Sequence, residues 1–140
     1  MFLLDTNILS EVIKKRPHPH LIERLRSQPS KHLFTSCICV MELRLGSALR
    51  KDFQAFWEKI SVEVLSRVQI IPIGADEAIM AGEILADLRK TGQMIGMEDA
   101  LIGASALTNG LTVVTANERH FARIKGLKVE NWLRQEMQKD

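Results

Sequence analysis

Cysteine, tyrosine and aromatic residues in general are scarce in this sequence of 140 residues. The two cysteines, Cys37 and Cys39, stand one residue apart, which is a poor spacing for a disulfide. The four histidines lack the spacing of zinc ligands, so both thiols are interpreted as small apolar side chains in a reducing, cytoplasmic compartment. With five phenylalanines, two tryptophans and no tyrosine, base stacking on an aromatic platform is not the expected way of binding nucleic acid.

A strong charge of one sign and a long hydrophobic segment are also absent. Nineteen lysines and arginines against seventeen acidic residues leave a net charge of +2, so any basic surface must be local. An acidic residue at position 5 leaves no room for the apolar region of a signal peptide. The longest uncharged run, residues 100–117, is broken by Thr108-Asn109-Gly110 and is interpreted as helix, turn and strand. No association with a membrane is therefore expected.

Short apolar runs alternate regularly with helical patterns. A hydrophobic content of 46% excludes disorder, and the length suits a single domain spanning residues 1–140. The alternation predicts a parallel sheet covered on both faces, that is, an α/β fold. Strands are expected at 2–4, 32–36, 68–73, 111–115 and 127–130. Helices are expected from Asp5-Thr6-Asn7 to Pro17, over about 20–28, 37–50 and 53–67, from a cap at Asp76 to Thr91-Gly92, and over 97–109.

Two carboxylates fall where such a sheet places its ligand crevice, beyond the carboxyl ends of the strands. Asp5 follows the first strand directly, although it is also a good N-cap for the first helix. Asp99 opens a helix of small apolar residues, which is expected to be buried with its positive N-terminal end near the sheet. Helix capping, shared with Glu98, is the structural alternative for Asp99.

A third carboxylate, Glu42, is placed in the crevice by the pattern of its own helix. The residues Ile38, Leu45, Gly46 and Leu49 predict an apolar stripe that contains Glu42. An ionised glutamate on a buried face is unfavourable unless it is paired or bound to a metal. The alternative is a surface glutamate at the edge of the stripe, with its charge in water.

Three carboxylates in one crevice repel one another unless a cation compensates. Oxygen ligands with open positions suit Mg²⁺ or Mn²⁺, which can polarise a phosphodiester and lower the pKa of a bound water. No Cys-His or Ser-His arrangement and no glycine-rich phosphate loop competes in the sequence. The residues therefore predict metal-assisted hydrolysis of a phosphodiester by Asp5, Glu42 and Asp99.

Three segments of the sequence together resemble the motifs of PIN domains. They are Leu-Leu-Asp-Thr-Asn-Ile-Leu at 3–9, Val-Met-Glu-Leu-Arg-Leu-Gly at 40–46 and Glu-Asp-Ala-Leu-Ile-Gly-Ala at 98–104. Later segments are similar to VapC-type toxins, namely 113–117, His120-Phe121, Gly126-Leu127 and Asn131-Trp132. The resemblance covers essentially the whole chain and implies a PIN-like fold, with a central parallel five-stranded sheet flanked by helices.

The resemblance also implies an activity. The implied protein is a Mg²⁺-dependent endoribonuclease, the toxin of a bacterial or archaeal type II toxin–antitoxin pair. Structured RNA, either tRNA or ribosomal RNA, is the implied substrate, and Asp5, Glu42 and Asp99 fall on the acidic triad. A cognate VapB-type antitoxin and a second copy of the chain, forming a homodimer, are the implied protein partners.

The chain departs from the family pattern near the fourth strand. Asn117, followed by Glu118, stands where members often carry a fourth acid, and His120 stands where they commonly have aspartate. Asn117 could ligate a metal through its carbonyl oxygen, and Glu118 or Glu98 could supply the missing acid. Three positions resemble those that hold the carboxylates by hydrogen bonds in the family: Thr6, Asn7 and Thr115.

Basic and apolar residues indicate surfaces for RNA and antitoxin. Those placed to contact an RNA backbone, which would make binding salt-dependent, are Lys14, Lys15, Arg16 and Arg119. Solvated helix faces are the structural alternative. The helix pair over 37–67 carries more apolar surface than one sheet face can cover, at Leu43, Leu49, Phe53, Phe56, Trp57 and Ile60. In the family an antitoxin segment lies in a groove formed partly by these helices, and it is expected to block the acidic crevice.

Other classes of protein are alternatives at this point. A response-regulator receiver domain would need paired acids after the first strand and an aspartate after the third, where Ile73-Gly74 stands. A haloacid-dehalogenase-like phosphatase would need an aspartate at position 7, where the chain has Asn7. A catalytically silent PIN-fold binding module is the third alternative, and metal-dependent RNA cleavage would separate it from the enzyme.

Overall fold

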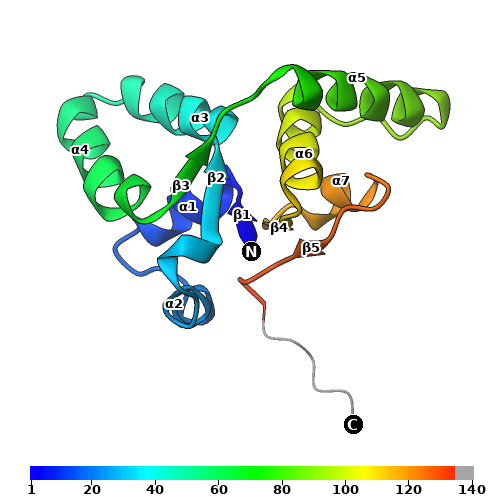
Figure 1. Ribbon diagram of the computed structural model, residues 1–140. Coiled ribbons are helices and arrows are strands. Elements are labelled where there is room, and N and C mark those ends of the chain that lie inside the picture. The colour runs from blue at the N-terminus through cyan, green and yellow to red at the C-terminus, as the bar shows by residue number, and fades with distance from the viewer. Residues whose placement is uncertain (135–140) are drawn as a thin grey trace, which may run out of the picture.

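Five parallel strands form the centre of the molecule, as the sequence predicts (Figure 1). The computed structural model describes residues 1–134, so residues 135–140 of the expected domain lie outside the described part. The strands are β1 (Phe2–Leu4), β2 (Leu33–Ser36), β3 (Gln69–Ile71), β4 (Thr112–Val114) and β5 (Val129–Glu130). Their order in the sheet is β3-β2-β1-β4-β5. Receiver domains have the order 2-1-3-4-5, so the topology excludes that alternative.

Helices fill the stretches between the strands. They are α1 (Thr6–Val12), α2 (Pro19–Arg26), α3 (Cys37–Ala48), α4 (Phe53–Glu63), α5 (Ala75–Lys90), α6 (Met97–Asn109) and α7 (Glu118–Ala122). Short 3₁₀ turns lie at Ser30–His32 (η1) and Leu65–Arg67 (η2). The helices expected up to Pro17 and residue 67 are therefore shorter than predicted. The pattern does not predict α7, because five residues are too few to show helical periodicity.

The ends of α5 and α6 show which local signals are decisive. Gly74, and not Asp76 as predicted, caps α5, and Asp76 lies in the first turn, where a negative charge suits the helix dipole. The bounds of α6 match the prediction. It ends because Gly110 adopts φ of 65°, a left-handed conformation that favours glycine and turns the chain toward β4. In the described part of the chain, no helix is long and apolar enough to cross a membrane.

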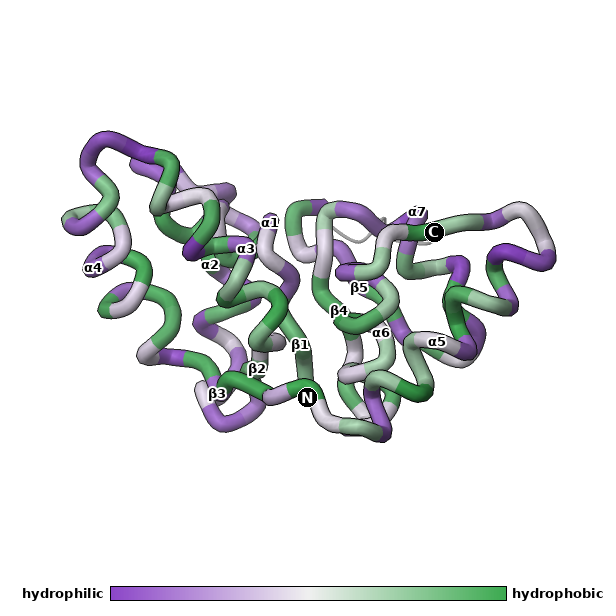
Figure 2. Tube along the Cα trace, turned by 90° about the horizontal axis from the view of Figure 1, so that it is seen from above, coloured by the Kyte–Doolittle hydropathy of each residue, from purple (hydrophilic) through white to green (hydrophobic). Residues whose placement is uncertain are grey.

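The helices gather in two halves on either side of β1 (Figure 2). In one half α1–α4 lie near β2 and β3, and in the other α5–α7 lie near β4 and β5 (Figure 1). As predicted, α6 is buried through its small residues, and it packs against α5 and β4. A methyl group at Gly103 would lie 2.5 Å from Cδ1 of Ile124, so a larger residue there would require the end of the Ile124 side chain to move. The first turn of the same helix carries Asp99.

The segment after β5 is anchored to the N-terminal half by Trp132. The side chain of Trp132 is 1% exposed, and its ring meets the ring of Phe2 edge-on, with 4.8 Å between the centroids. Arg24 of α2 lies over the same indole and forms an ion pair of 3.0 Å with Glu130. The indole N–H donates to the same Glu130 oxygen at 3.2 Å. The two ends of the described chain are thereby joined through one buried aromatic cluster.

Candidate active site

Asp5 lies at the carboxyl end of β1 and is only 6% exposed. Its Oδ1 accepts a hydrogen bond from the backbone N–H of Thr6, and its Oδ2 accepts one from the hydroxyl of Thr115, both at 2.8 Å. The backbone N–H of Asp5 donates to the carbonyl of Val114, which continues the pairing of β1 with β4. Asp5 is therefore the N-cap of α1 and a residue of the crevice at once, so the two interpretations are compatible.

Glu42 reaches the same crevice from α3. Its Oε1 accepts a hydrogen bond of 2.8 Å from the hydroxyl of Thr6, whose backbone holds Asp5. The predicted apolar stripe of α3 is wrong, since Leu45 is 60% and Leu49 is 80% exposed. The buried face of the helix consists of Cys39, Leu43 and Ser47. Because apolar residues stand on both faces of α3, periodicity alone could not select the inner one.

Cys39 is a residue of the site that the sequence analysis missed. Its Sγ lies 3.9 Å from Oδ1 of Asp5, and one ligand atom from each of Asp5, Cys39 and Glu42 lies within 4.8 Å of the others. Burial and, to a smaller extent, the charge of Asp5 together raise the pKa of the thiol to about 11. The thiol is therefore neutral at physiological pH. Its place three residues before Glu42, on the same side of a helix, is the signal that could have revealed it.

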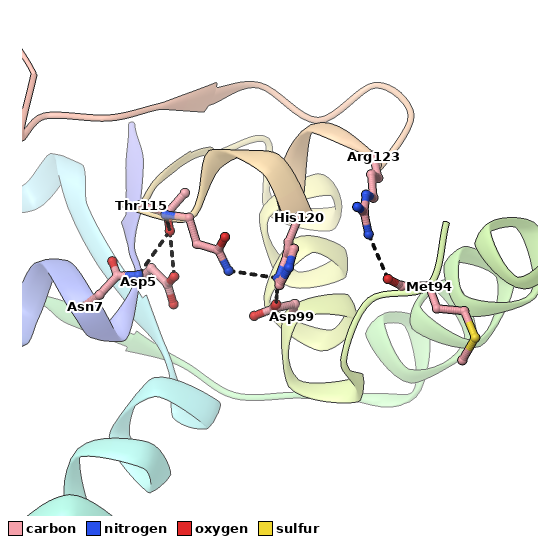
Figure 3. A network of polar contacts seen from close by, with 8 residues as sticks. Asp5, Asn7, Met94, Asp99, Thr115, His120 and Arg123 are labelled. Atoms are coloured by element: carbon pink, nitrogen blue, oxygen red, sulfur yellow. Dashed lines mark hydrogen bonds and ion pairs between the residues drawn. The ribbon is translucent and has the colours of Figure 1, made fainter. Parts of the chain in front are cut away.

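Asp99 lies on the opposite side of the crevice, in the first turn of α6 (Figure 3). Its Oδ2 lies 3.2 Å from Nδ1 of His120, and the side-chain nitrogen of Asn117 lies 2.8 Å from the same ring nitrogen. Sequence reasoning did not connect His120 with Asp99, because the two belong to different helices. Asn117, predicted as a metal ligand, turns its amide toward His120.

The remaining predicted residues surround these carboxylates. Asn7 donates to the Thr115 hydroxyl at 3.4 Å and accepts from the backbone N–H of Ala116 at 3.1 Å. Glu98 is exposed beside Asp99. Glu118 forms an ion pair with Arg134, which occupies one of its oxygens. Hydrogen bonds thus join Asp5, Thr6, Glu42 and Thr115, whereas Asp99 of α6 has His120 as its partner and the two extra acids lie at the margin.

The acidic residues disfavour one another's ionised forms. Burial is the largest cause that raises the pKa of Asp5 and of Glu42. The charge of Asp99 raises both values further, and Glu98 adds to the effect on Glu42. Hydrogen bonds from Thr115 and Thr6 oppose these shifts. Buried carboxylate oxygens of this kind suit a hard divalent cation, whereas a neutral thiol such as Cys39 is a poor ligand for one.

We expect the metal-free protein to lose stability as the pH rises, by more than its Glu42→Gln variant does. Below the ordinary pKa values of 3.8 for Asp5 and 4.5 for Glu42, both carboxyl groups are protonated in the folded and in the unfolded chain, and no stability is lost. As the pH rises from there through the raised folded-state pKa values, the unfolded chain releases its protons more readily, so the free energy of unfolding falls. The free energy of unfolding in urea, measured in EDTA at about pH 4 and about pH 8, provides the comparison. Equal pH dependence in parent and variant would contradict the electrostatic picture of the site.

A groove of about 680 Å³ leads away from the carboxylates between α1, α3 and α4. Thr6 and Glu42 line its acidic end, and Leu43, Phe56 and Ile60 form an apolar floor. The cations along it are Lys14, Lys15, Arg50 and Lys59. Two further residues predicted to contact RNA, Arg16 and Arg119, are exposed but do not line the groove.

Comparison with known proteins agrees with this geometry. The PIN domain family matches residues 2–127. The chain is 36% identical to Ribonuclease VapC2 of Haemophilus influenzae over 132 residues, covering 94% of this chain and 98% of that protein. It is also 36% identical to the tRNA(fMet)-specific endonuclease VapC of Salmonella typhimurium, covering 94% and 97%. A crystal structure of DNA-bound VapBC from Salmonella typhimurium superposes with a TM-score of 0.86 at 34% identity, covering 94% of this chain and 97% of that one.

The matches extend over both halves of the sheet and include the segments that carry the three carboxylates. They therefore exclude the alternative of a haloacid-dehalogenase-like phosphatase. The chain belongs to the PIN domain family, within its VapC branch.

Proposed function

We propose that the chain is a metal-dependent endoribonuclease that hydrolyses phosphodiester bonds in structured RNA, as the toxin of a type II toxin–antitoxin pair. The observation that carries this proposal is the convergence of Asp5, Glu42 and Asp99 at one edge of the PIN sheet, where burial and mutual repulsion raise the pKa of the first two. Relatives named as ribonucleases, one of them specific for tRNA(fMet), support the substrate class.

In this proposal Asp5, Glu42 and Asp99 hold Mg²⁺, for which Mn²⁺ can substitute, while the amide of Asn117, predicted as a fourth ligand, is directed at His120. The ion, when bound, supplies positive charge that activates water and stabilises the charge developing on the phosphate. The chain's own polar groups keep the carboxylates in position. The hydroxyl of Thr115 holds Asp5 and that of Thr6 holds Glu42, so neither side chain must reorganise as the reaction proceeds.

The groove beside the carboxylates offers cations for the RNA backbone. Lys14 and Lys15, just after α1, and Lys59 of α4 all line it, although Lys14 is paired with Glu11 and Arg50 with Asp52. Arg16 and Arg119 extend the positive charge onto the surface. Binding through these residues would neutralise phosphates and depend on salt. Exposed Glu98 and the paired Glu118 serve as supporting acids at the rim.

The protein partners follow from the surfaces that flank the site. We place a segment of a VapB-type antitoxin in the groove, where an apolar floor and the adjoining Glu42 would let it block the carboxylates. A stripe of exposed apolar residues on α3 and at its C-cap supports a homodimer; it consists of Met41, Leu45 and Leu49. The proposed compartment is the cytoplasm of a bacterium or archaeon, where the RNA substrate is present.

Purified, antitoxin-free protein is expected to cut total bacterial RNA into discrete products in Mg²⁺ and to leave it intact in EDTA. The Asp99→Asn variant should lose these products, whereas Asp87→Asn on the exposed surface of α5 should keep them. Sequencing of the new RNA ends identifies the substrate and the cleavage site. A folded preparation that binds RNA or antitoxin without cleavage would favour the catalytically silent binding module.

A further inference from the structure

His120 belongs to a chain of contacts that joins the two sides of the acidic site (Figure 3). Its Nδ1 lies against Asp99 Oδ2 at 3.2 Å and against the amide of Asn117 at 2.8 Å. The backbone N–H of Asn117 donates to the Thr115 hydroxyl at 2.9 Å, and that hydroxyl donates to Asp5 at 2.8 Å. A residue of α7 is thereby connected to both Asp5 and Asp99.

Only one neutral tautomer of His120 is compatible with its contact to Asp99. An ionised carboxylate can only accept hydrogen bonds, so Nδ1 must carry the hydrogen. A protonated Nδ1 cannot accept from the Asn117 amide, and a half-turn of that amide about its last bond turns its oxygen toward the ring. One Nδ1–H is then shared between Asp99 and Asn117. The His120 side chain is 42% exposed, and Nε2 bonds to no other group of the described residues.

Asp99 needs such a partner because it faces two other carboxylates. Its charge contributes to the raised pKa of both Asp5 and Glu42, so the repulsion acts across the crevice in the absence of a cation. The side chain of Asp99 is only 24% exposed, and water screens it incompletely. Asp99 also lies outside the group of ligand atoms within 4.8 Å of one another. The contact of Oδ2 with His120 restrains the carboxylate and leaves Oδ1 without a partner among the described residues.

We propose that His120 is a positioning residue that orients the Asp99 carboxylate for a divalent cation, with Asn117 fixing the imidazole ring. The inference deepens the proposed function and rests on it, since it concerns the same site. Hydrogen-bonded partners of metal ligands typically change metal affinity by about 10–100-fold. The effect of His120 is therefore expected in metal binding first and in RNA cleavage only as a consequence.

The substitutions His120→Asn and His120→Gln test which ring nitrogen matters. Asparagine places an amide N–H near the position of Nδ1, whereas glutamine places one near Nε2. The dissociation constant of Mn²⁺ is measured on the full-length protein without RNA, from the electron paramagnetic resonance signal of the free ion. We expect it to rise about 10–100-fold in His120→Gln and His120→Ala and to stay within about threefold in His120→Asn. His18→Gln, at an exposed histidine before α2, is the matched control and should bind like the parent.

Cleavage assays then separate a positioning role from contact with RNA. At saturating Mn²⁺, His120→Gln should recover most of the parental kcat with an unchanged KM for RNA. Three results would each overturn the proposal. They are an unchanged Mn²⁺ affinity in His120→Gln, equal losses of Mn²⁺ affinity in the asparagine and glutamine variants, and absence of Mn²⁺ binding by the parent. Should His120→Ala not fold, the two larger side chains keep the test intact.

The positioning role and the nuclease function fail in different ways. Metal binding that depends on His120 in a protein that cleaves no RNA would uphold the positioning role and refute the proposed function. RNA cleavage by the parent, combined with normal Mn²⁺ affinity in His120→Gln, would refute the positioning role and leave the nuclease intact.

Discussion

Asparagine in place of Asp5 is expected to lower metal-dependent RNA cleavage by about a thousandfold, because a bound metal supplies several kcal/mol and about 4 kcal/mol corresponds to that factor. Asp5 is the most buried of the three candidate ligands, so a neutral amide there removes charge where water cannot replace it. The fold should persist. Asparagine has the same shape and remains a good N-cap, with Oδ1 still accepting from the backbone N–H of Thr6.

The measurement is kcat at saturating Mg²⁺, accompanied by thermal melting of the metal-free protein. Because the substitution removes a buried charge repelled by Asp99, the melting temperature at neutral pH should stay equal or rise. Asp87→Asn makes the same chemical change on an exposed part of α5 and should leave both quantities unchanged. Cleavage by Asp5→Asn at the parental rate would remove Asp5 from the reaction.

Alanine in place of Trp132 is expected to destabilise the protein by about 3–5 kcal/mol, the usual range for truncating a buried tryptophan. The indole is almost fully buried and is held by Phe2, Arg24 and Glu130, so its loss opens a cavity and leaves the Arg24–Glu130 pair without its packing surface. Domains are stable by only about 5–15 kcal/mol, so a large share of the total would be lost. The melting temperature should fall by roughly 10 °C or more.

Two variants calibrate this result. Trp132→Phe keeps an aromatic ring but removes the N–H donated to Glu130, so its melting temperature should lie between those of the parent and of Trp132→Ala. Trp57→Ala truncates a tryptophan of α4 that is only half-buried and should cost less. A melting temperature of Trp132→Ala close to that of the parent would show that the segment after β5 contributes little to the fold.

Much of the fold could be predicted from local pattern. The five strands occur where short apolar runs stand, and α6 has the predicted bounds because small apolar residues and Gly110 determine its burial and its end. The order of the strands could not be derived in this way, since it depends on which runs pair in space. The inner face of α3 was misassigned for a similar reason, because Leu45 and Leu49 fit a helical stripe as well as Cys39 and Leu43 do.

The candidate site was predictable where one residue follows one strand or opens one helix. Asp5 and Asp99 have such positions, whereas Glu42 was assigned from an apolar stripe that the structure does not bury and then from the resemblance to PIN domains. The contacts between elements were not predictable. His120 meets Asp99 from a helix too short to be recognised, and Cys39 meets Asp5 from the face of α3 that the pattern assigned incorrectly. Tertiary packing produces both contacts, and the spacing of Cys39 and Glu42 could at most have placed the thiol on the side of α3 that carries Glu42.

The position of the groove beside the carboxylates affects how antitoxin recognition can change during evolution. Every residue that lines it lies between Thr6 and Ile60, whereas Asp99 and His120 come from the other half of the molecule. If an antitoxin docks there as proposed, drift in the N-terminal half would alter recognition while the contacts of Asp99 stay untouched. Chimeras that exchange this half between related chains should therefore inherit their antitoxin preference from it. Toxins that share one chemistry could then diverge until each is bound by its own antitoxin and not by that of another pair.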